Sequence, residues 1–344
     1  MTTAVPPATD TARTGSPTAK SLLQLGGCIL GMVILILIGP PAGLSVAAWR
    51  VFALYLATMA ALLMRPFPEP AIFLLAIGTT GVAVRGATTV SVKDLLSGYS
   101  DPTAWLVFSA FFIGTAFSVT GLGRRIAYKL IGALGRTPLR LGLVACVTDL
   151  VLAPATPSNA ARTGGITYPI IRNIASALGS EPGPDAKKIG RYLTMVTYYA
   201  SFATSTIFLT AIAFLPLTVK VAQEGLGLKP LSWMQYFTYA SVPGLVMLFI
   251  VPFVVYLMDR PTIKTIDNKK LAAAELDRIG PMSRGEKWLL ALFVTAILGW
   301  AVGSFYDINA NAIAILFVAL LLVSGVITWQ DMLDTKAAWN TFMW

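Results

Sequence analysis

The sequence alternates between long apolar blocks and short stretches that contain proline, glycine and charged residues. Eight of the blocks are long enough to cross the ~30 Å hydrocarbon core of a lipid bilayer as helices. The predicted membrane spans are 22–38, 46–64, 70–84, 104–120, 192–219, 236–257, 288–302 and 310–328. This pattern predicts an all-α integral membrane protein with no soluble domain.

One further apolar stretch does not fit the pattern of a simple span. Residues 141–155 are apolar, but they lead into a polar, turn-rich run at 154–165 and then into a second, shorter apolar segment. Basic clusters flank this stretch at 124–140 and 172–191. Because basic residues of short loops collect on the cytoplasmic side, both clusters are expected on the same face of the membrane. The segment 138–177 is therefore predicted to be a re-entrant hairpin, which enters the membrane and returns.

The placement of charge also predicts the orientation of the chain. The formal net charge is +10, and most of the basic residues fall in loops on one side of the predicted topology, including the loop 259–287. The positive-inside rule assigns that side, and with it the N-terminus, to the cytoplasm. The orientation of the chain in the membrane thus explains the positive charge, and no nucleic-acid partner is expected.

Composition excludes several classes of site. The chain is 56% hydrophobic and 12% charged, whereas soluble domains carry about 25% charged residues. It contains no histidine, and its two cysteines, Cys28 and Cys146, lie in apolar blocks. The sequence therefore lacks the residues needed for a zinc site, for a Cys/His or Ser/His/Asp nucleophile, and for a disulfide framework. Residues 1–20 are rich in Ser, Thr, Pro and Ala, which predicts a disordered cytoplasmic tail rather than a cleaved signal.

A short internal repeat predicts inverted symmetry. Asp94-Leu95-Leu96 followed by Ala104-Trp105 recurs as Asp331-Met332-Leu333 followed by Ala338-Trp339, and the topology places the first copy outside and the second inside. Inverted repeats are common in secondary transporters. A matching second hairpin would fall near position ~393, so the sequence is expected to stop within the second repeat and to lack on the order of 150 residues.

The tip of the predicted hairpin is the first candidate site. Irregular backbone at membrane depth is tolerated only where it is buried in protein or lines a wet cavity. Pro154 and Pro157 should interrupt the entering helix, and Gly164-Gly165 should allow a tight turn into the returning helix. The free N–H groups of that helix would attract anions. The predicted substrate-binding residues are Thr156, Ser158, Asn159, Arg162 and Thr163, with Arg162 able to grip a carboxylate through two parallel hydrogen bonds.

The same residues have structural alternatives. Ser158 and Asn159 are typical of residues that cap a helix, and Arg162 could form an ion pair with Asp149 in the entering helix. At the tip of a re-entrant hairpin we favour substrate contact for Ser158 and Asn159. For Arg162 the sequence leaves ligand contact and the ion pair equally open.

The middle of the fifth full span is the second candidate site. Residues 201–206 carry four hydroxyls and little apolar bulk. A break here would expose carbonyls and hydroxyls to a cation or to the substrate. The alternative, which the residues alone favour, is that these hydroxyls bond back to their own helix.

The hairpin sequence resembles the first signature hairpin of the divalent anion/sodium symporter family. The branch it resembles contains bacterial citrate/succinate and tartrate/succinate exchangers and the plastid 2-oxoglutarate/malate translocator. The resemblance rests on Thr148-Asp149-Leu150, on Thr156-Pro157-Ser158-Asn159-Ala160-Ala161-Arg162-Thr163-Gly164-Gly165, and on Ser100-Asp101-Pro102-Thr103-Ala104-Trp105, Gly280-Pro281-Met282-Ser283-Arg284 and Ala338-Trp339-Asn340.

The resemblance implies a homodimeric, elevator-type transporter. The scaffold helices would be 21–137 and 235–258, and the transport-domain part would be 138–219, made of the hairpin 138–177 and a broken helix at 190–219. Residues 288–344 would begin the second repeat.

The resemblance also implies roles for individual residues. Ser158 and Asn159 would contact a substrate carboxylate, and together with Thr204 and Ser205 they would form a cation region. Two departures stand out: Ala160 replaces the threonine of the signature, and no second signature hairpin is present.

The sequence as a whole predicts a secondary transporter of the bacterial inner membrane, not an enzyme. The expected substrates are di- or tricarboxylates such as succinate, malate, 2-oxoglutarate, citrate or tartrate, and the expected mode of transport is exchange. No cofactor other than sodium is expected. We also hypothesise that Arg162 permanently supplies the positive charge that sodium supplies in relatives. The alternatives are an intramembrane enzyme with Ser158 or Ser205 as nucleophile, an anion channel, and a non-functional fragment.

Overall fold

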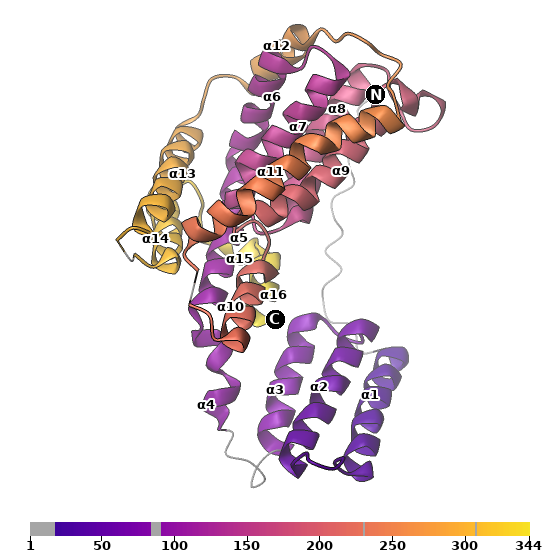
Figure 1. The fold of residues 1–344 in the computed structure, drawn as a ribbon, viewed down its shortest axis with the longest axis vertical. Helices are drawn as coiled ribbons and strands as arrows, with labels where there is room; N and C mark the ends of the chain where they lie inside the picture. Colours follow the sequence, from indigo (N-terminus) through magenta and orange to yellow (C-terminus); the bar gives the residue numbers. More distant parts are fainter. Residues whose placement is uncertain (1–17, 84–90, 230, 307) are drawn as a thin grey trace. The chain divides into compact units, whose positions relative to one another are not determined.

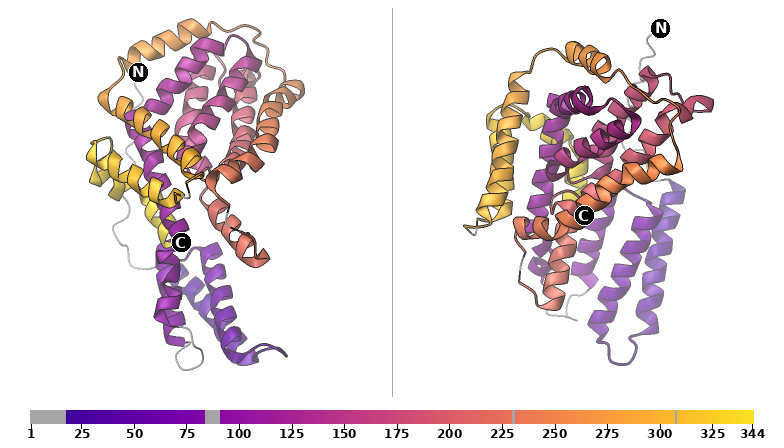
Figure 2. Two further views of the ribbon diagram at one scale, coloured as in Figure 1. Left: turned by 60° about the vertical axis from the view of Figure 1, so that its left-hand side comes forward. Right: turned by 45° about the horizontal axis from the view of Figure 1, so that its top comes forward.

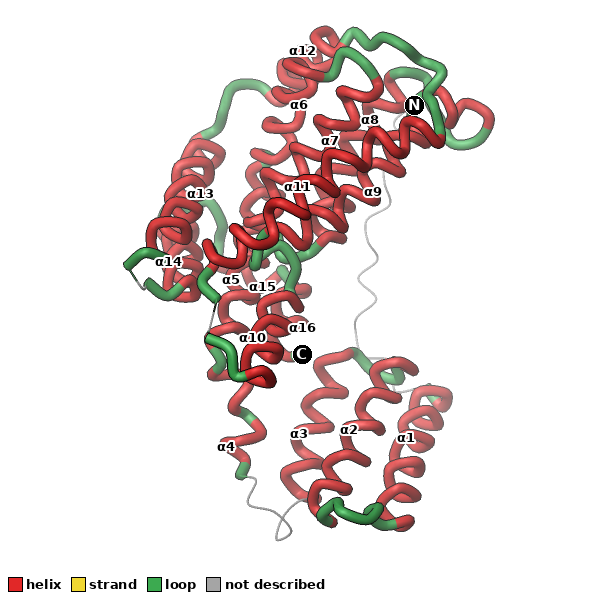
Figure 3. Tube along the Cα trace, viewed as in Figure 1, coloured by secondary structure: helices red, strands yellow, loops and turns green. Residues whose placement is uncertain are grey.

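The computed structural model describes residues 18–83, 91–229, 231–306 and 308–344, and these residues form helices and connecting loops without a strand (Figure 3). The prediction of an all-α protein is confirmed. Of the predicted tail 1–20, residues 1–17 lie outside the described residues, and helix α1 already includes Ala19 and Lys20.

The chain divides into two compact units, of which the first comprises the described residues up to Ser100 together with Met343–Trp344. Its helices are α1 (Ala19–Ile38), α2 (Val46–Met64), α3 (Glu69–Ala83), the short α4 (Val92–Leu95) and the 3₁₀ turn η1 (Ser97–Ser100). Helix α2 lies between α1 and α3 (Figure 1). The indole N–H of Trp49 donates to the carbonyl of Leu35 at 2.7 Å and so ties α2 to α1.

The second unit, Asp101–Phe342, contains the hairpin and the largest apolar core. Its longer helices are α5 (Pro102–Thr120), α6 (Leu122–Leu134), α7 (Pro138–Leu152), α8 (Tyr168–Ala177), α9 (Gly190–Ile207), α10 (Phe214–Leu226), α11 (Trp233–Met258), α12 (Asn268–Ile279), α13 (Arg284–Gly303) and α14 (Ala310–Val323). The short elements are η2 (Ala153–Ala155), η3 (Ala160–Thr167), η4 (Pro184–Lys188), α15 (Trp329–Asp334) and α16 (Lys336–Met343).

Helix α9 lies at the centre of this unit and packs against α7, α8 and α11. The approach of α7 to α9 is close because Gly142 has no side chain: a Cβ at this position would collide with the hydroxyl of Tyr192. That hydroxyl instead donates to the carbonyl of Pro252 in α11 at 3.2 Å. The three helices are thereby fixed around one buried tyrosine.

The two ends of segment 138–177 lie at the same end of the second unit. The N–H of Ile266 donates to the carbonyl of Arg136 at 2.9 Å, and the N–H of Ile263 donates to the carbonyl of Lys188 at 3.3 Å. Three residues of extended chain span at most about 10 Å, far less than the ~30 Å of a bilayer core. The segment between Arg136 and Lys188 therefore forms a helical hairpin that returns to its starting side, and residues 259–267 run along that side from α11 to α12 (Figures 1 and 2).

Five of the eight predicted spans are recovered as long apolar helices, and the entering helix of the hairpin, Pro138–Ala155, is a sixth. Among the described residues, six helices are long and apolar enough to cross a membrane: Ala19–Ile38, Val46–Met64, Pro102–Thr120, Pro138–Ala155, Trp233–Met258 and Arg284–Gly303. The spans predicted at 70–84 and 310–328 correspond to the shorter apolar helices Glu69–Val82 and Ala310–Val323, and Val84 lies outside the described residues. The span predicted at 192–219 is divided between α9 and α10.

The two copies of the internal repeat contact each other reciprocally. The ring of Trp105 lies 5.1 Å from that of Phe342, and the ring of Phe108 lies 4.9 Å from that of Trp339. Trp105 corresponds to Trp339 in the repeat, and Phe108 corresponds to Phe342. Reciprocal pairing of this kind is what a two-fold relation produces. It supports the inverted repeat, which stays a prediction.

The predicted functional division of the chain is not the same as its division by packing. Helices α5, α6 and α11, predicted to belong to a scaffold, lie in the same compact unit as the hairpin. Helix α6 packs against α7 and η3, and α11 packs against α9. Packing alone therefore does not separate a scaffold domain from a transport domain, and this division of the chain stays a prediction.

Candidate functional site

The hairpin tip is formed where two prolines end the entering helix. Helix α7 ends at Leu152, the 3₁₀ turn η2 follows, and the chain is irregular from Thr156 until η3, a π-helix, begins at Ala160. Gly164-Gly165 was predicted to form the turn, but both glycines lie inside η3. The prediction was wrong because Pro154 and Pro157 already reverse the chain before it reaches them.

The tip is attached to the segment that interrupts the predicted fifth span. The hydroxyl of Thr210 donates to the carbonyl of Pro154, and the N–H of Ala213 donates to the carbonyl of Pro157, each at 2.8 Å. Thr156, by contrast, is buried, and its hydroxyl donates to the carbonyl of Leu152 at 2.8 Å. Thr156 was predicted to bind substrate, but here it closes the end of α7.

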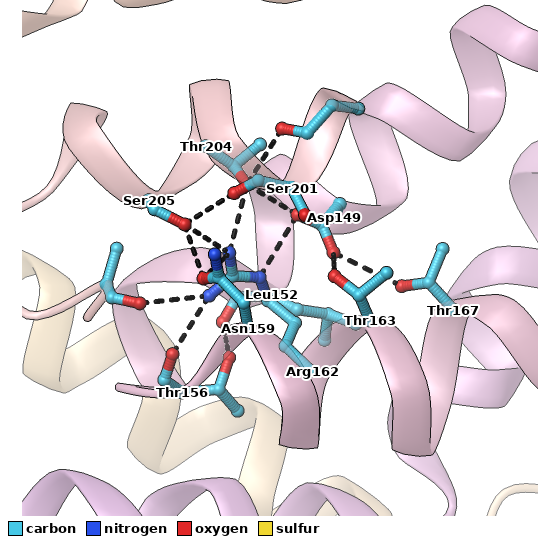
Figure 4. Close-up of polar contacts among 12 residues, drawn as sticks. Asp149, Leu152, Thr156, Asn159, Arg162, Thr163, Thr167, Ser201, Thr204 and Ser205 are labelled. Atoms are coloured by element: carbon cyan, nitrogen blue, oxygen red, sulfur yellow. Dashed lines mark hydrogen bonds and ion pairs between the residues drawn. The ribbon is translucent and has the colours of Figure 1, made fainter. Parts of the chain in front are cut away.

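Asp149 is the acceptor around which the buried part of the site is arranged. Its side chain is 1% exposed. One carboxylate oxygen, Oδ1, accepts from the hydroxyls of Thr163 at 3.1 Å and Thr167 at 3.4 Å. The other, Oδ2, accepts from Nε of Arg162 at 3.1 Å and from the hydroxyl of Thr204 (Figure 4). A carboxylate inside a membrane protein is thus satisfied entirely by protein donors.

Arg162 is fully buried, and protein groups engage all of its nitrogens. Besides Asp149, it donates through Nη1 to the carbonyls of Thr156 at 2.9 Å and Ala211 at 3.1 Å. Through Nη2 it donates to Asn159 Oδ1 at 3.2 Å, Thr204 Oγ1 at 3.0 Å and Ser205 Oγ at 3.4 Å. The ion pair that the sequence left open is therefore present. A bidentate grip on a substrate carboxylate would require these bonds to open.

Ser158 and Asn159 are the half-buried residues of the tip. The hydroxyl oxygen of Ser158 accepts from the N–H of Ala161 at 3.3 Å, so Ser158 does cap η3, while Asn159 makes no such cap. Within the described ranges, Nδ2 of Asn159 has no hydrogen-bond partner, whereas its Oδ1 accepts from Arg162. Of the predicted substrate-binding residues, these two have capacity to contact a ligand, and Thr163 is committed to Asp149.

The break in the fifth span lies later than predicted. Helix α9 continues through Thr204 and Ser205 to Ile207, and the interruption is at 208–213. Other hydroxyls of this segment bond back to their own helix, with Ser201 donating to the carbonyl of Tyr198 at 2.7 Å and Thr206 to that of Ala203 at 2.9 Å. The hydroxyl-rich segment thus stays helical, and only its buried face reaches the hairpin.

The oxygens of the predicted cation region are already used. Asn159, Thr204 and Ser205 all accept from Nη2 of Arg162, so a guanidinium lies where a sodium ion would have to bind. Two cations cannot share one set of neutral oxygens at these distances without strong repulsion. A sodium ion therefore does not fit this half of the site in the arrangement described.

Sequence reasoning missed two contributors to the site. Thr167 and the carbonyl of Ala211 complete the environments of Asp149 and Arg162. Thr167 lies four positions after Thr163, which places both hydroxyls on one face of a helical segment. That spacing could have identified Thr167, whereas nothing local predicts the contact of Ala211.

A separate cavity of about 750 Å³ lies among α5, α10, α11, α13 and α14. Its lining includes Lys220, Gln223, Trp233, Trp300 and Asn309, and no residue of the hairpin tip. It is therefore distinct from the predicted substrate site.

Comparisons with known proteins agree with this architecture. The family model described as the sodium:sulfate symporter transmembrane region matches residues 19–344. The inner membrane protein YbhI of Escherichia coli is 46% identical over 330 residues, which cover 94% of this chain and 68% of the relative. The putative malate transporter YflS of Bacillus subtilis is 38% identical over 332 residues, covering 96% of this chain and 68% of the relative.

An L-tartrate/succinate antiporter of Escherichia coli is 35% identical over 329 residues, covering 91% of this chain and 67% of the relative. The curated relatives are longer: the chain spans 66% and 68% of the length of two bacterial ones and 56% of a chloroplast dicarboxylate transporter of spinach. The matched proteins are transporters by name or family, not enzymes, so the intramembrane enzyme is no longer an alternative.

Proposed function

Because the chain belongs to the sodium:sulfate symporter family, as the hairpin signature predicted, we propose that its gene product carries di- or tricarboxylate anions across a membrane by exchange. Relatives named as malate, dicarboxylate and tartrate/succinate transporters support the class of substrate. Succinate, malate, 2-oxoglutarate, citrate and tartrate are the candidate substrates.

The observation that carries this proposal is that two half-buried donors at the tip lie beside a buried cation. Ser158 and Asn159 are half-buried at the tip, and Nη2 of Arg162 lies 3.2 Å behind the Oδ1 of Asn159. A carboxylate accepts hydrogen bonds and carries negative charge, so it gains from both features. We assign Ser158 and Asn159 to direct substrate contact. We assign Arg162, which is buried next to Asn159, to electrostatic stabilisation of the negative charge on the bound carboxylate.

The guanidinium also bears on the coupling ion. Its contacts with Asn159, Thr204 and Ser205 occupy the oxygens that a sodium ion would need. Arg162 is permanently charged, so it can neutralise substrate charge without an ion that binds and leaves. This arrangement favours exchange of one anion for another over sodium-coupled uptake.

The remaining features of the proposal come from the family resemblance and from charge. We propose a homodimer that works by alternating access, with the hairpin re-entering the membrane from the cytoplasm. The basic clusters at 124–140 and 172–191 support this side, because the two ends of the hairpin lie together. The bacterial inner membrane is the proposed location, with a cytoplasmic N-terminus.

Counterflow in proteoliposomes tests the proposal. The full-length gene product is reconstituted with internal succinate, and uptake of labelled succinate, malate and citrate is measured with and without sodium. We expect sodium-independent uptake that requires an internal carboxylate. Uptake that needs sodium but no internal anion would contradict exchange, and flux far above carrier rates would indicate a channel.

Variants locate the site in the same assay. Ser158→Ala and Asn159→Ala should each raise the KM for the transported anion, because each removes a donor at the tip. Asn173→Ala, at an exposed position of the returning helix α8, is the matched control and should transport normally. Equal KM values for the three variants would exclude the tip as the binding site.

A further inference from the structure

The amide of Asn159 has an orientation fixed by its neighbours. Its Oδ1 accepts from Nη2 of Arg162 at 3.2 Å and from the hydroxyl of Ser205 (Figure 4). A guanidinium can only donate, so a rotated amide would place its NH₂ group against another donor. The carbonyl side of Asn159 must therefore face inward, and the NH₂ side faces away from Arg162.

Arg162 in turn is held by Asp149. The two side chains are 0% and 1% exposed, and Nε lies 3.1 Å from Oδ2 of the carboxylate. Thr163 and Thr167 hold the other carboxylate oxygen, so the carboxylate plane is fixed on both sides. The chain of contacts runs from Asp149 through Arg162 to the Oδ1 of Asn159, and it ends at an NH₂ group on a half-buried residue.

We propose that Asp149 is a positioning residue for substrate selectivity: through Arg162 it fixes the amide of Asn159 so that an NH₂ donor, and not a carbonyl, faces the substrate. The inference rests on the proposed function and adds to it a residue that does not touch the substrate. When Ser158 and Asn159 both donate, a carboxylate can accept from each with one of its two oxygens, whereas a carboxamide would set its NH₂ group against one of the two donors. Loss of the Asp149 carboxylate frees the guanidinium to turn, and the amide can then present its oxygen.

A purely structural ion pair would have a different consequence. Removing one partner of a buried pair leaves an uncompensated charge and destabilises the fold strongly, whereas replacing both partners is far less costly. If charge balance were the only role of Asp149, Asp149→Asn would lower stability and leave the selectivity unchanged. If Asp149 positions Asn159 through Arg162, Asp149→Asn lowers the selectivity as well. The double replacement, which also removes the guanidinium that orients the amide, then restores stability alone.

The experiment compares succinate with succinamate, in which one carboxylate is replaced by a carboxamide. KM values are measured by exchange in the full-length gene product for the wild type, Asp149→Asn, the double variant Asp149→Asn/Arg162→Gln, and Thr206→Val. Thr206→Val is the control, because the hydroxyl it removes is at an exposed position of α9 and donates to the carbonyl of Ala203 in the same helix. Thermal unfolding of each variant in detergent is measured in parallel.

We expect the ratio of the succinamate KM to the succinate KM to fall about tenfold in Asp149→Asn, which corresponds to about 1.4 kcal/mol of lost discrimination. The double variant should unfold near the wild-type temperature and keep the low ratio, and Thr206→Val should keep the wild-type ratio. Should Asp149→Asn fail to fold, the double variant carries the test alone. A wild-type ratio in the double variant would overturn the inference. Failure of wild-type protein to exchange any carboxylate would instead refute the proposed function.

Discussion

The carboxylate of Asp149 lies 3.1 Å from Nε of Arg162, and both side chains are shielded from solvent. Asp149 comes from the entering helix of the hairpin and Arg162 from the π-helix that follows the tip. An ion pair of this kind is stable only because hydroxyls and carbonyls satisfy the remaining donors and acceptors. The hairpin is therefore closed by a polar network inside an otherwise apolar unit.

Thr204 connects this network to helix α9, and its removal should weaken it. Thr204→Val keeps the shape of the side chain but removes a donor to Asp149 and an acceptor for Arg162. We expect a loss of about 1–3 kcal/mol in the free energy of unfolding, because two buried charges each lose a partner. Thr206→Val, at an exposed position of the same helix, should change it by less than about 0.5 kcal/mol. Chemical denaturation in detergent compares them, and equal losses would contradict this role of Thr204.

A second buried ion pair joins α6 to the first turn of α13. Arg125 donates to both carboxylate oxygens of Glu286, at 2.6 and 3.1 Å, and also to the carbonyls of Gly280 and Pro281. Arg125→Met should destabilise the protein by about 3–5 kcal/mol, since it leaves Glu286 buried and unpaired. Adding Glu286→Gln should recover much of that loss, and Arg124→Met, next to it at an exposed position, should have little effect. A double variant no more stable than Arg125→Met would argue against a paired charge here.

The close contact of α7 with α9 makes Gly142 intolerant of a side chain. A Cβ there would overlap the hydroxyl of Tyr192. Gly142→Ala is expected to cost about 1–3 kcal/mol through overpacking. Gly31→Ala in α1 is the control, because a Cβ there meets no atom within 4 Å and alanine favours a helix. Melting temperatures of the two variants should thus shift in opposite directions or differ by several degrees. If Gly142→Ala melts with the wild type, the helices are less tightly packed than described.

One ion pair at the end of the second unit should give a pH-dependent stability. Arg191 donates to both oxygens of Asp259, and this hydrogen bonding holds the pKa of the Asp259 carboxyl below its usual value. A lowered folded-state pKa stabilises the protein above the unfolded-state value of about 3.9, and the stabilisation is lost as the pH falls through the folded-state pKa. Asp259→Asn should therefore lower the unfolding temperature at pH 7 and make progressively less difference below about pH 4. The exposed Asp277→Asn provides the comparison, and a deficit for Asp259→Asn that persists undiminished at low pH would contradict the ion pair.

Much of the architecture could be read from the periodicity and the charge of the sequence. The long apolar blocks specified the spans, because a helix must be apolar along its length to lie in lipid. The basic clusters around Arg136 and Lys188 predicted that segment 138–177 returns to its starting side, and backbone bonds to the loop 259–267 hold the two ends of the hairpin near each other. These features depend on composition over many residues, so single side chains do not change them.

The details of the site depended on contacts that sequence patterns do not encode. The sequence identified the residues of the tip. It could not show which of them bond to protein partners, because that depends on how the hairpin packs against α9. Arg162 and Asp149 could be matched as a pair by their charges, whereas the carbonyl of Ala211 could not, since every residue has one. The break after Ile207 was misplaced because hydroxyls within a membrane helix are satisfied equally well by the helix itself.

The backbone bonds from Thr262, Ile263 and Ile266 to the two ends of the hairpin have a mechanical consequence. If the hairpin were displaced along the membrane normal, the connection between α11 and α12 would have to travel with it, or three backbone hydrogen bonds would have to break. These bonds connect the loop 259–267 to the hairpin, so in the proposed transport movement a shorter loop would limit how far the hairpin could be displaced.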